Sequence, residues 1–135
     1  EDVSRRIKAL QTAMELYRDP YLASVDAVWV IPQRERLRQI FVDVGLQLAA
    51  LHLELDQAHE ALDCCQRVLE EEPCSENAHR LAMRVHAGMG NRIEIAVQFE
   101  KCHTALKTEV DAEPSRQTVE LFERLMETTS RILDH

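Results

Sequence analysis

The 135-residue chain has few of the residues that shape β-structures. It contains three glycines and four prolines, and aromatic side chains make up 4% of it. Sandwiches and barrels need frequent turns and strands rich in β-branched and aromatic residues. No segment alternates apolar and polar residues with the period of two that is typical of a half-buried strand. The composition therefore predicts an all-α fold without strands.

Long hydrophobic runs are also missing. The most apolar stretch, residues 42–55, is interrupted by Asp43, Gln47, His52 and Glu54. It therefore falls short of the roughly 20 apolar residues that a helix needs to cross a bilayer. Neither a signal peptide nor a membrane anchor is visible, and we expect a cytoplasmic protein without membrane contact.

The chain has no excess of basic residues. Sixteen Lys and Arg residues against 24 Asp and Glu residues give a formal net charge of −8. A free-standing DNA-binding domain needs a basic face that neutralises phosphates. We therefore expect that this chain does not bind nucleic acid directly.

The residue spacings of common metal sites and catalytic centres are absent too. Six histidines and four cysteines occur without a Cys-x-x-Cys, His-x-x-x-His or His-Glu-x-x-His motif. No phosphate-binding glycine loop and no Gly-x-Ser-x-Gly turn occurs. We interpret Cys64, Cys65, Cys74 and Cys102 as free thiols, because a chain of this length folds without cross-links. The sequence predicts no enzyme, no metal and no cofactor.

Apolar residues recur at helical spacing along most of the chain, beginning with Val3, Ile7, Leu10, Met14 and Tyr17. About six helices are expected from this spacing and from the capping residues. They run from Asp2 or Ser4 to near Asp19-Pro20, from about Gln33 to Glu54, from about Gln57 to Glu71, from a Ser75 cap to Gly90, from about Asn91 to Val110, and from Pro114-Ser115 through Ile132, with a brief turn from Asp26 to Trp29.

Short connections between these helices favour antiparallel hairpins, and hairpins in tandem indicate a helical repeat. Ala61 and Pro73 lie twelve residues apart, as do the small residue and the proline of a tetratricopeptide repeat. Ala96 follows Ala61 after 35 residues, close to the repeat period, but no proline follows Ala96 at the same distance. The fifth helix should therefore be longer than a repeat helix, with its apolar stripe continuing to Val110. We predict one domain over residues 1–135, a tetratricopeptide-like stack of antiparallel helix hairpins.

Several short segments match a known family in order and spacing. Leu16-Tyr17-Arg18-Asp19-Pro20-Tyr21-Leu22 is similar to its Leu-Tyr-Arg-Gly-Pro-Phe-Leu segment, and further matches follow at Trp29, Arg34-Glu35-Arg36-Leu37-Arg38, Leu69, Pro73, Glu76, His79-Arg80, Gly90, Ala96, Glu113-Pro114-Ser115 and Thr118. Asp19 and Asp111 stand where that family usually has glycine, which bears on how tightly two turns close. With these matches the chain resembles the bacterial transcriptional activator domain, the helical module of a class of transcription regulators.

The resemblance implies a division of labour within a regulator. A winged helix-turn-helix that reads DNA would precede this module, and we expect that DNA-binding domain to be absent from residues 1–135, which begin at Glu1 and not at methionine. The module itself would self-associate, for example as a homodimer, or contact RNA polymerase or another domain of the same regulator. The alternative is a stand-alone tetratricopeptide-like adaptor or peptide-binding scaffold unconnected with transcription. The sequence upstream in the intact gene product distinguishes the two.

Trp29, Arg34 and Arg38 are the candidate partner-contact residues. Arg34 and Arg38 share one helix face, but ion pairs with acidic residues of the first helix or a neighbouring domain are favoured over partner recognition, because most charge runs are solvated or intramolecular. Trp29 is interpreted first as a core anchor at the junction of the first two helices and second as an interface residue. His79 and His86 share a helix face, and we interpret them as packing or solvent contacts.

Overall fold

The computed structural model describes residues 2–17 and 31–133, and within these ranges the chain forms helices without strands. The helices are α1 (Asp2–Tyr17), α3 (Ile31–Glu54), α4 (Ala58–Glu71), α5 (Glu76–Gly88), α6 (Arg92–Val110) and α7 (Arg116–Leu133). The predicted all-α class is confirmed, and the predicted helix bounds match closely. None of these described helices is long and apolar enough to cross a lipid bilayer. The predicted turn from Asp26 to Trp29 lies outside the described residues.

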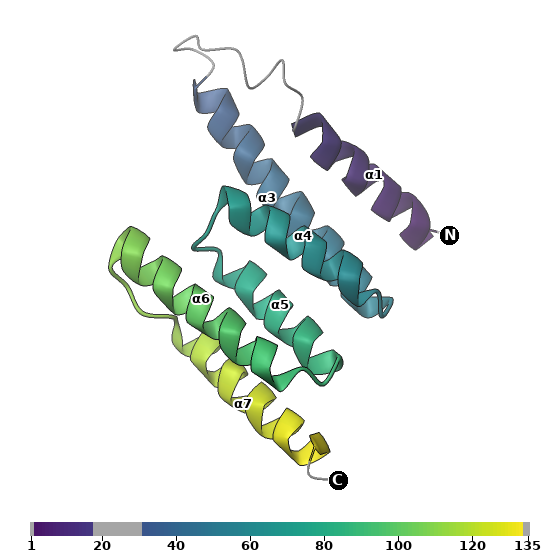
Figure 1. Ribbon diagram of the computed structural model, residues 1–135. Helices are drawn as coiled ribbons and strands as arrows, with labels where there is room; N and C mark the ends of the chain where they lie inside the picture. The colour runs from purple at the N-terminus through teal and green to yellow at the C-terminus, as the bar shows by residue number, and fades with distance from the viewer. Residues whose placement is uncertain (1, 18–30, 134–135) are drawn as a thin grey trace.

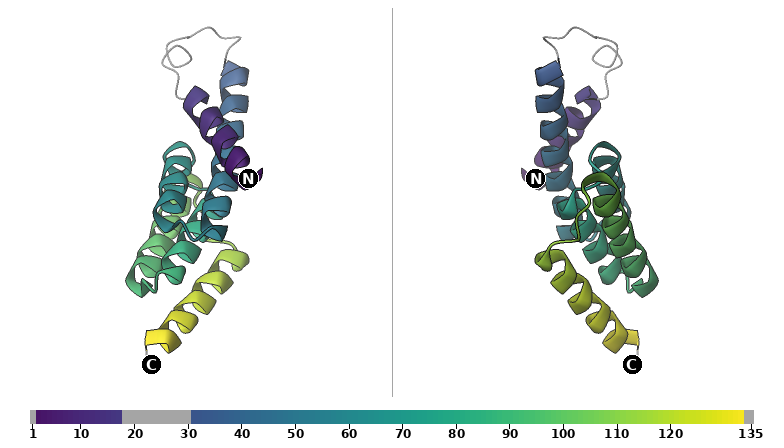
Figure 2. Two further views of the ribbon diagram at one scale, coloured as in Figure 1. Left: turned by 90° about the vertical axis from the view of Figure 1, so that its right-hand side faces the viewer. Right: turned by 90° about the vertical axis from the view of Figure 1, so that its left-hand side faces the viewer.

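The helices follow one another in an elongated stack, with α1 at one end and α7 at the other (Figure 1). Helices α3 and α4 form one antiparallel hairpin and α5 and α6 form the next, while α1 packs on α3, and α7 packs on both α5 and α6. Figure 2 shows α7 inclined to the helices before it. This arrangement confirms the predicted tetratricopeptide-like stack.

Local sequence signals explain where several helices begin and end. Pro32 lies in the first turn of α3, where its missing N–H would have no partner in any case. Ser75 caps α5 with its hydroxyl oxygen, which accepts from the Ala78 N–H at 3.3 Å. Gly90, with φ of 70°, ends the turn after α5. Asp111 adopts the left-handed conformation (φ 52°, ψ 47°) at the end of α6, so this turn closes without the glycine that is usual in the family.

The core is divided into three buried clusters that join neighbouring helices. One cluster connects α1, α3, α4 and α5 and contains Met14, Phe41, Leu48, Ala49, Cys64, Cys65 and Ala82. A second is formed by Val42, Val68 and Ala78. The third joins α5, α6 and α7 through Met83, Ile95 and Leu121, and beside it the rings of Phe99 and Phe122 stack at 4.1 Å. The first two clusters both join α3, α4 and α5, and the third joins α5 to α6 and α7, so each helix is held by its neighbours.

Helices α3 and α4 approach each other closely at Gly45. A Cβ atom at this position would lie 2.5 Å from Cγ2 of Val68, a side chain with 0% exposure. Ala61, the small residue of the predicted repeat, is also completely buried. Gly45 was not predicted as a contact point, because a glycine inside a helical pattern does not by itself show what packs against it.

The predicted inward stripe of α6 is wrong at its last residue. Val110 is 61% exposed, whereas Leu106, one turn earlier, is 6% exposed. All four residues of 107–110 are exposed, so the final turn of α6 extends beyond the helices that bury the rest of its stripe. Helical spacing identifies one face of a helix but not how far its neighbours cover that face.

Candidate protein-interaction groove

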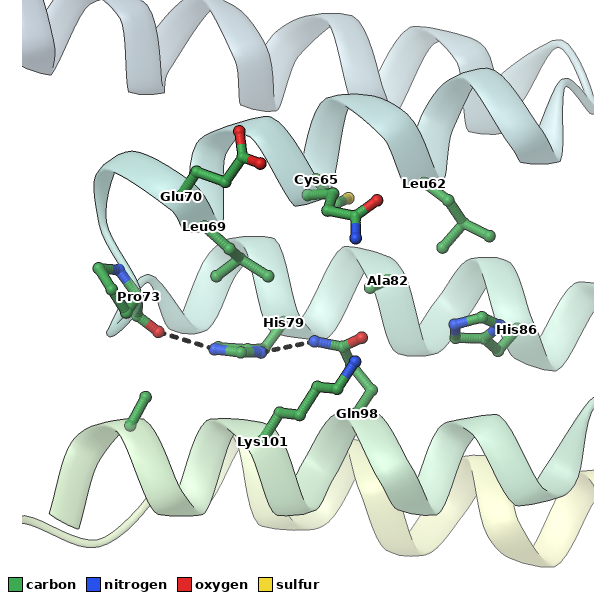
Figure 3. Close-up of a pocket in the computed structure, with 12 residues that line it drawn as sticks. Leu62, Cys65, Leu69, Glu70, Pro73, His79, Ala82, His86, Gln98 and Lys101 are labelled. Atoms are coloured by element: carbon green, nitrogen blue, oxygen red, sulfur yellow. Dashed lines mark hydrogen bonds between the residues drawn. The ribbon is translucent and has the colours of Figure 1, made fainter. Parts of the chain in front are cut away.

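A groove of about 480 Å³ lies between α4, α5 and α6. Its surface combines apolar groups from α4 and α5 with polar groups that come mainly from α5 and α6, as Figure 3 shows. The lining residues are Leu62, Cys65, Gln66, Leu69 and Glu70 from α4, Pro73 from the connection, His79, Ala82 and His86 from α5, and Gln98, Lys101 and Ala105 from α6. An apolar concave surface with a few directed polar groups is the usual make-up of a binding site.

His79 joins the two sides of this groove by two hydrogen bonds (Figure 3). Its Nε2 lies 2.9 Å from the carbonyl oxygen of Pro73, and its Nδ1 lies 2.7 Å from the side-chain Nε2 of Gln98. A carbonyl oxygen only accepts and an amide NH₂ only donates, so both bonds are satisfied by the neutral imidazole with its proton on Nε2. Burial lowers the pKa of His79. The ring therefore stays neutral and links the α4–α5 connection to α6.

A second imidazole, that of His86, and the ammonium group of Lys101 also line the groove. The Nδ1 of His86 is buried and has no hydrogen-bond partner among the described residues. Burial is also the main reason why the pKa of His86 is lowered, with a smaller contribution from the positive charge of Lys101. Lys101 extends from α6 toward α5 (Figure 3). His86 on α5 and Lys101 on α6 therefore offer hydrogen-bonding groups and one positive charge to a partner.

Residues of two distant family motifs meet where α7 begins. One carboxylate oxygen of Glu76 accepts from the Ser115 N–H at 2.9 Å and from the Thr118 hydroxyl at 2.6 Å. Arg80 donates to the hydroxyl oxygen of Thr118 at 2.7 Å, and its guanidinium lies 3.9 Å from Glu76. Thr118 has 0% exposure. The closing Glu-Pro-Ser motif thus fixes the start of α7 on α5, the helix that carries His79.

This arrangement also determines the charge of Glu76. Burial alone would raise the pKa of Glu76, but the hydrogen bonds from Thr118 and Ser115, together with the positive charge of Arg80, hold it below its usual value. The carboxylate therefore stays ionised and keeps accepting both hydrogen bonds.

Of the predicted contact residues, Trp29 lies outside the described residues. The guanidinium of Arg38 lies 3.0 Å from the carboxylate of Glu35 on the same helix and donates to the carbonyl oxygen of Glu71 at 3.4 Å. It also lies 4.0 Å from the carboxylate of Glu72. These contacts connect α3 to the C-terminal end of α4, a neighbour that the sequence analysis did not name. Neither Arg38 nor the half-buried Arg34 lines the groove.

The groove residues could not be identified as a group from the sequence. The shared face of His79 and His86 was predicted, but their interpretation as packing or solvent contacts did not include the hydrogen bonds of His79 to Pro73 and Gln98. Gln98 and Lys101 are three residues apart on α6, so they share a face. No local pattern indicates that this face lies opposite the histidines of another helix.

Three of the thiols lack the properties of nucleophiles. Burial raises the pKa of Cys64 to about 11, that of Cys65 to about 12 and that of Cys102 to about 11. A reactive or metal-binding thiol needs the thiolate form, which these values disfavour. Within residues 2–17 and 31–133, no group of three or more His, Cys, Asp or Glu side chains is placed to hold a metal ion.

Comparison with protein families matches residues 1–126 to the family described as bacterial transcriptional activator domain. The matched region contains the whole groove and the Glu76–Thr118 contact. Comparison with the curated proteins gave no match, and neither did comparison with the solved structures.

Proposed function

The chain belongs to the bacterial transcriptional activator domain family, and on this basis we propose that it is the protein-binding module of a bacterial transcription regulator. The family makes it a regulatory domain related to transcription activation. The proposal adds that the chain acts without catalysis, by self-association or by contact with RNA polymerase or another domain of the regulator. The groove between α4, α5 and α6 is the observation that carries it.

The groove supports protein binding because its polar groups are held in place before a partner arrives. The hydrogen bonds of His79 fix the imidazole and the Gln98 amide at their positions. A preorganised surface loses less conformational entropy when it binds. Stacked helix hairpins generally use such concave surfaces for peptides or helices of other proteins.

Charge supports the division of labour within the regulator. A net charge of −8 opposes binding to the phosphate backbone, so we assign DNA reading to a separate domain and treat residues 1–135 as one helical unit. A module of a transcription regulator works in the cytoplasm, and we propose that location. Trp29, Arg34 and Arg38 remain candidate contacts for a neighbouring domain, and Arg34 and Arg38 lie outside the groove.

Blocking the groove tests this function. Gln66 is an exposed residue of the α4 wall, and Gln66→Trp would place a large side chain over the groove. Glu60→Trp is the matched control, because Glu60 is exposed on the same helix and does not line the groove. Self-association is measured by sedimentation velocity, binding to RNA polymerase by pull-down, and binding to duplex DNA by gel shift at about 150 mM salt.

We expect the chain to bind itself or the polymerase, and Gln66→Trp to weaken that binding while Glu60→Trp leaves it intact. No shift of the duplex DNA is expected. Protein binding that is equal in the two variants would exclude the groove as the contact surface. DNA binding by the chain alone would contradict the proposed division of labour.

A further inference from the structure

We propose that the groove binds a partner segment in which an acidic side chain stands next to an apolar one. The acidic group would lie against Lys101 on α6, and the apolar group would lie over Leu62 and Leu69 on α4. This inference rests on the proposed function, since it specifies the chemistry of the partner for the same groove.

The α4 side of the groove selects for an apolar group. Leu62 and Leu69 are half-buried and lie two turns apart on one face of α4, and Ala82 lies opposite them on α5. An aliphatic side chain placed between them would remove the remaining apolar surface from water. Gln66, which lies between Leu62 and Leu69 on α4 and also lines the groove, carries a neutral amide, so no charge on the partner is required here.

The α6 side of the groove selects for a negative charge. Among the described residues the ammonium group of Lys101 has no ion-pair or hydrogen-bond partner, although acidic residues outnumber basic ones in the chain. Lys101 lines the groove together with His79 and His86, and its positive charge contributes to the lowered pKa of both rings. A carboxylate of the partner would neutralise this charge, and a ring N–H of His86, whose Nδ1 has no partner among the described residues, is available as a further donor.

The opposite wall determines the orientation of the segment. Glu70 lines the groove from α4, with its carboxylate directed away from Lys101 (Figure 3). A carboxylate near Glu70 would meet a like charge, whereas the same group near Lys101 meets an opposite one. The acidic side chain is therefore directed toward α6, with the apolar side chain toward α4.

Three synthetic peptides test this chemistry. They share one leucine-containing frame and differ only at two adjacent positions, which are both Asp, both Asn or both Lys. Each is titrated into the isotopically labelled 135-residue chain, and amide chemical shifts in the NMR spectrum report the site and the affinity. We expect the Asp peptide to shift the amides around Gln98 and Lys101 and to bind about fivefold more tightly than the Asn peptide at low salt.

Variants of Lys101 connect the preference to this residue. Lys101→Glu should weaken binding of the Asp peptide about tenfold, while Lys101→Arg should retain it. Lys107→Glu is the matched control, because Lys107 is an exposed lysine of the same helix outside the groove. The control should bind like the unchanged chain.

Three results would overturn the inference: equal or tighter binding of the Asn or Lys peptide, equal effects of Lys101→Glu and Lys107→Glu, or no shifts at the groove with any peptide. The first two results would contradict the proposed charge preference but would still agree with a protein-binding role of the groove. The Gln66→Trp experiment tests that surface without reference to the charge of the partner, so the two failures are distinguishable.

Discussion

Gly45 on α3 allows the stiff, fully buried side chain of Val68 on α4 to approach the α3 backbone. Gly45→Ala would raise helix propensity by about 1 kcal/mol. The added methyl group would lie 2.5 Å from Val68, however, and overpacking of this kind costs about 1 to 3 kcal/mol. We expect a net loss of stability, measured by equilibrium unfolding in urea.

Gly88→Ala provides the matched comparison at the residue scale. Gly88 is the last residue of α5, and a Cβ there would meet nothing within 4 Å. This substitution should leave stability unchanged or raise it by up to about 1 kcal/mol. Equal stability of the two variants would show that the approach of α3 and α4 does not depend on Gly45.

His79 makes stability depend on pH in a defined direction. Burial lowers the pKa of His79 from its ordinary value of 6.5, so below pH 6.5 the unfolded chain binds a proton that the folded chain does not. The stabilising contribution of the neutral His79 is complete above pH 6.5 and decreases as the pH falls toward the pKa of His79 in the folded chain. We expect the free energy of unfolding, measured in urea, to decrease steadily as the pH is lowered from 6.5.

The variant His79→Gln isolates this effect. It should be less stable than the unchanged chain at neutral pH, because the bonds to Pro73 and Gln98 are altered. Its stability should nevertheless vary less with pH below 6.5. Some dependence remains, since the pKa of His86 is lowered in the same direction. An unchanged pH slope in His79→Gln would contradict the assignment of a buried neutral imidazole.

At the scale of elements, α7 is docked by a polar contact as well as by its apolar face. Thr118→Val keeps the shape of a fully buried side chain but removes the hydroxyl between Glu76 and Arg80. When a buried polar group loses its hydrogen-bond partner, the protein loses about 1 to 3 kcal/mol of stability. We expect a loss of this size, together with faster hydrogen exchange concentrated in α7.

Arg116→Ala is the control for this element. Arg116 and Glu120 form an exposed ion pair at 3.0 Å on the same helix. Its loss should change stability by no more than about 0.5 kcal/mol and leave exchange in α7 nearly unaffected. Exchange that rises equally in Arg116→Ala and Thr118→Val would indicate that the Glu76 contact does not hold the helix.

The same scale shows which element boundaries could be read from the sequence. Pro32, Ser75 and Gly90 mark helix ends through the conformations and hydrogen bonds of their own residue types, and the structure places helix ends at these positions. The predicted burial of Val110 was wrong, because burial at the end of α6 depends on how far the neighbouring helices extend. Asp111 shows that the left-handed turn survives without glycine.

At the scale of the whole molecule, each helix contacts mainly its neighbours along the stack. Leu48 on α3 is 1% exposed and belongs to the cluster shared by α1, α3, α4 and α5. Leu48→Ala should cost about 2 to 5 kcal/mol. Because stability in stacked repeats is largely local, hydrogen exchange should accelerate most in α1, α3 and α4 and least in α7.

Leu121→Ala should accelerate hydrogen exchange at the opposite end of the stack from Leu48→Ala. Leu121 is 4% exposed and lies in the cluster shared by α5, α6 and α7. Its truncation should accelerate exchange in α7 and α6 more than in α1. Uniform acceleration along the chain in both variants would instead describe a single cooperative core.

The amino-acid sequence by itself determined the helical class, the order of the helices, most of their ends and the family. These properties depend on residue type and on spacing within one element, and both are local. The tertiary structure alone decided that Glu76 meets Ser115 and Thr118, that His79 bonds to Gln98, and that Lys101 faces the same groove. These contacts join residues 19 to 42 positions apart, and their geometry is set by how separate helices pack.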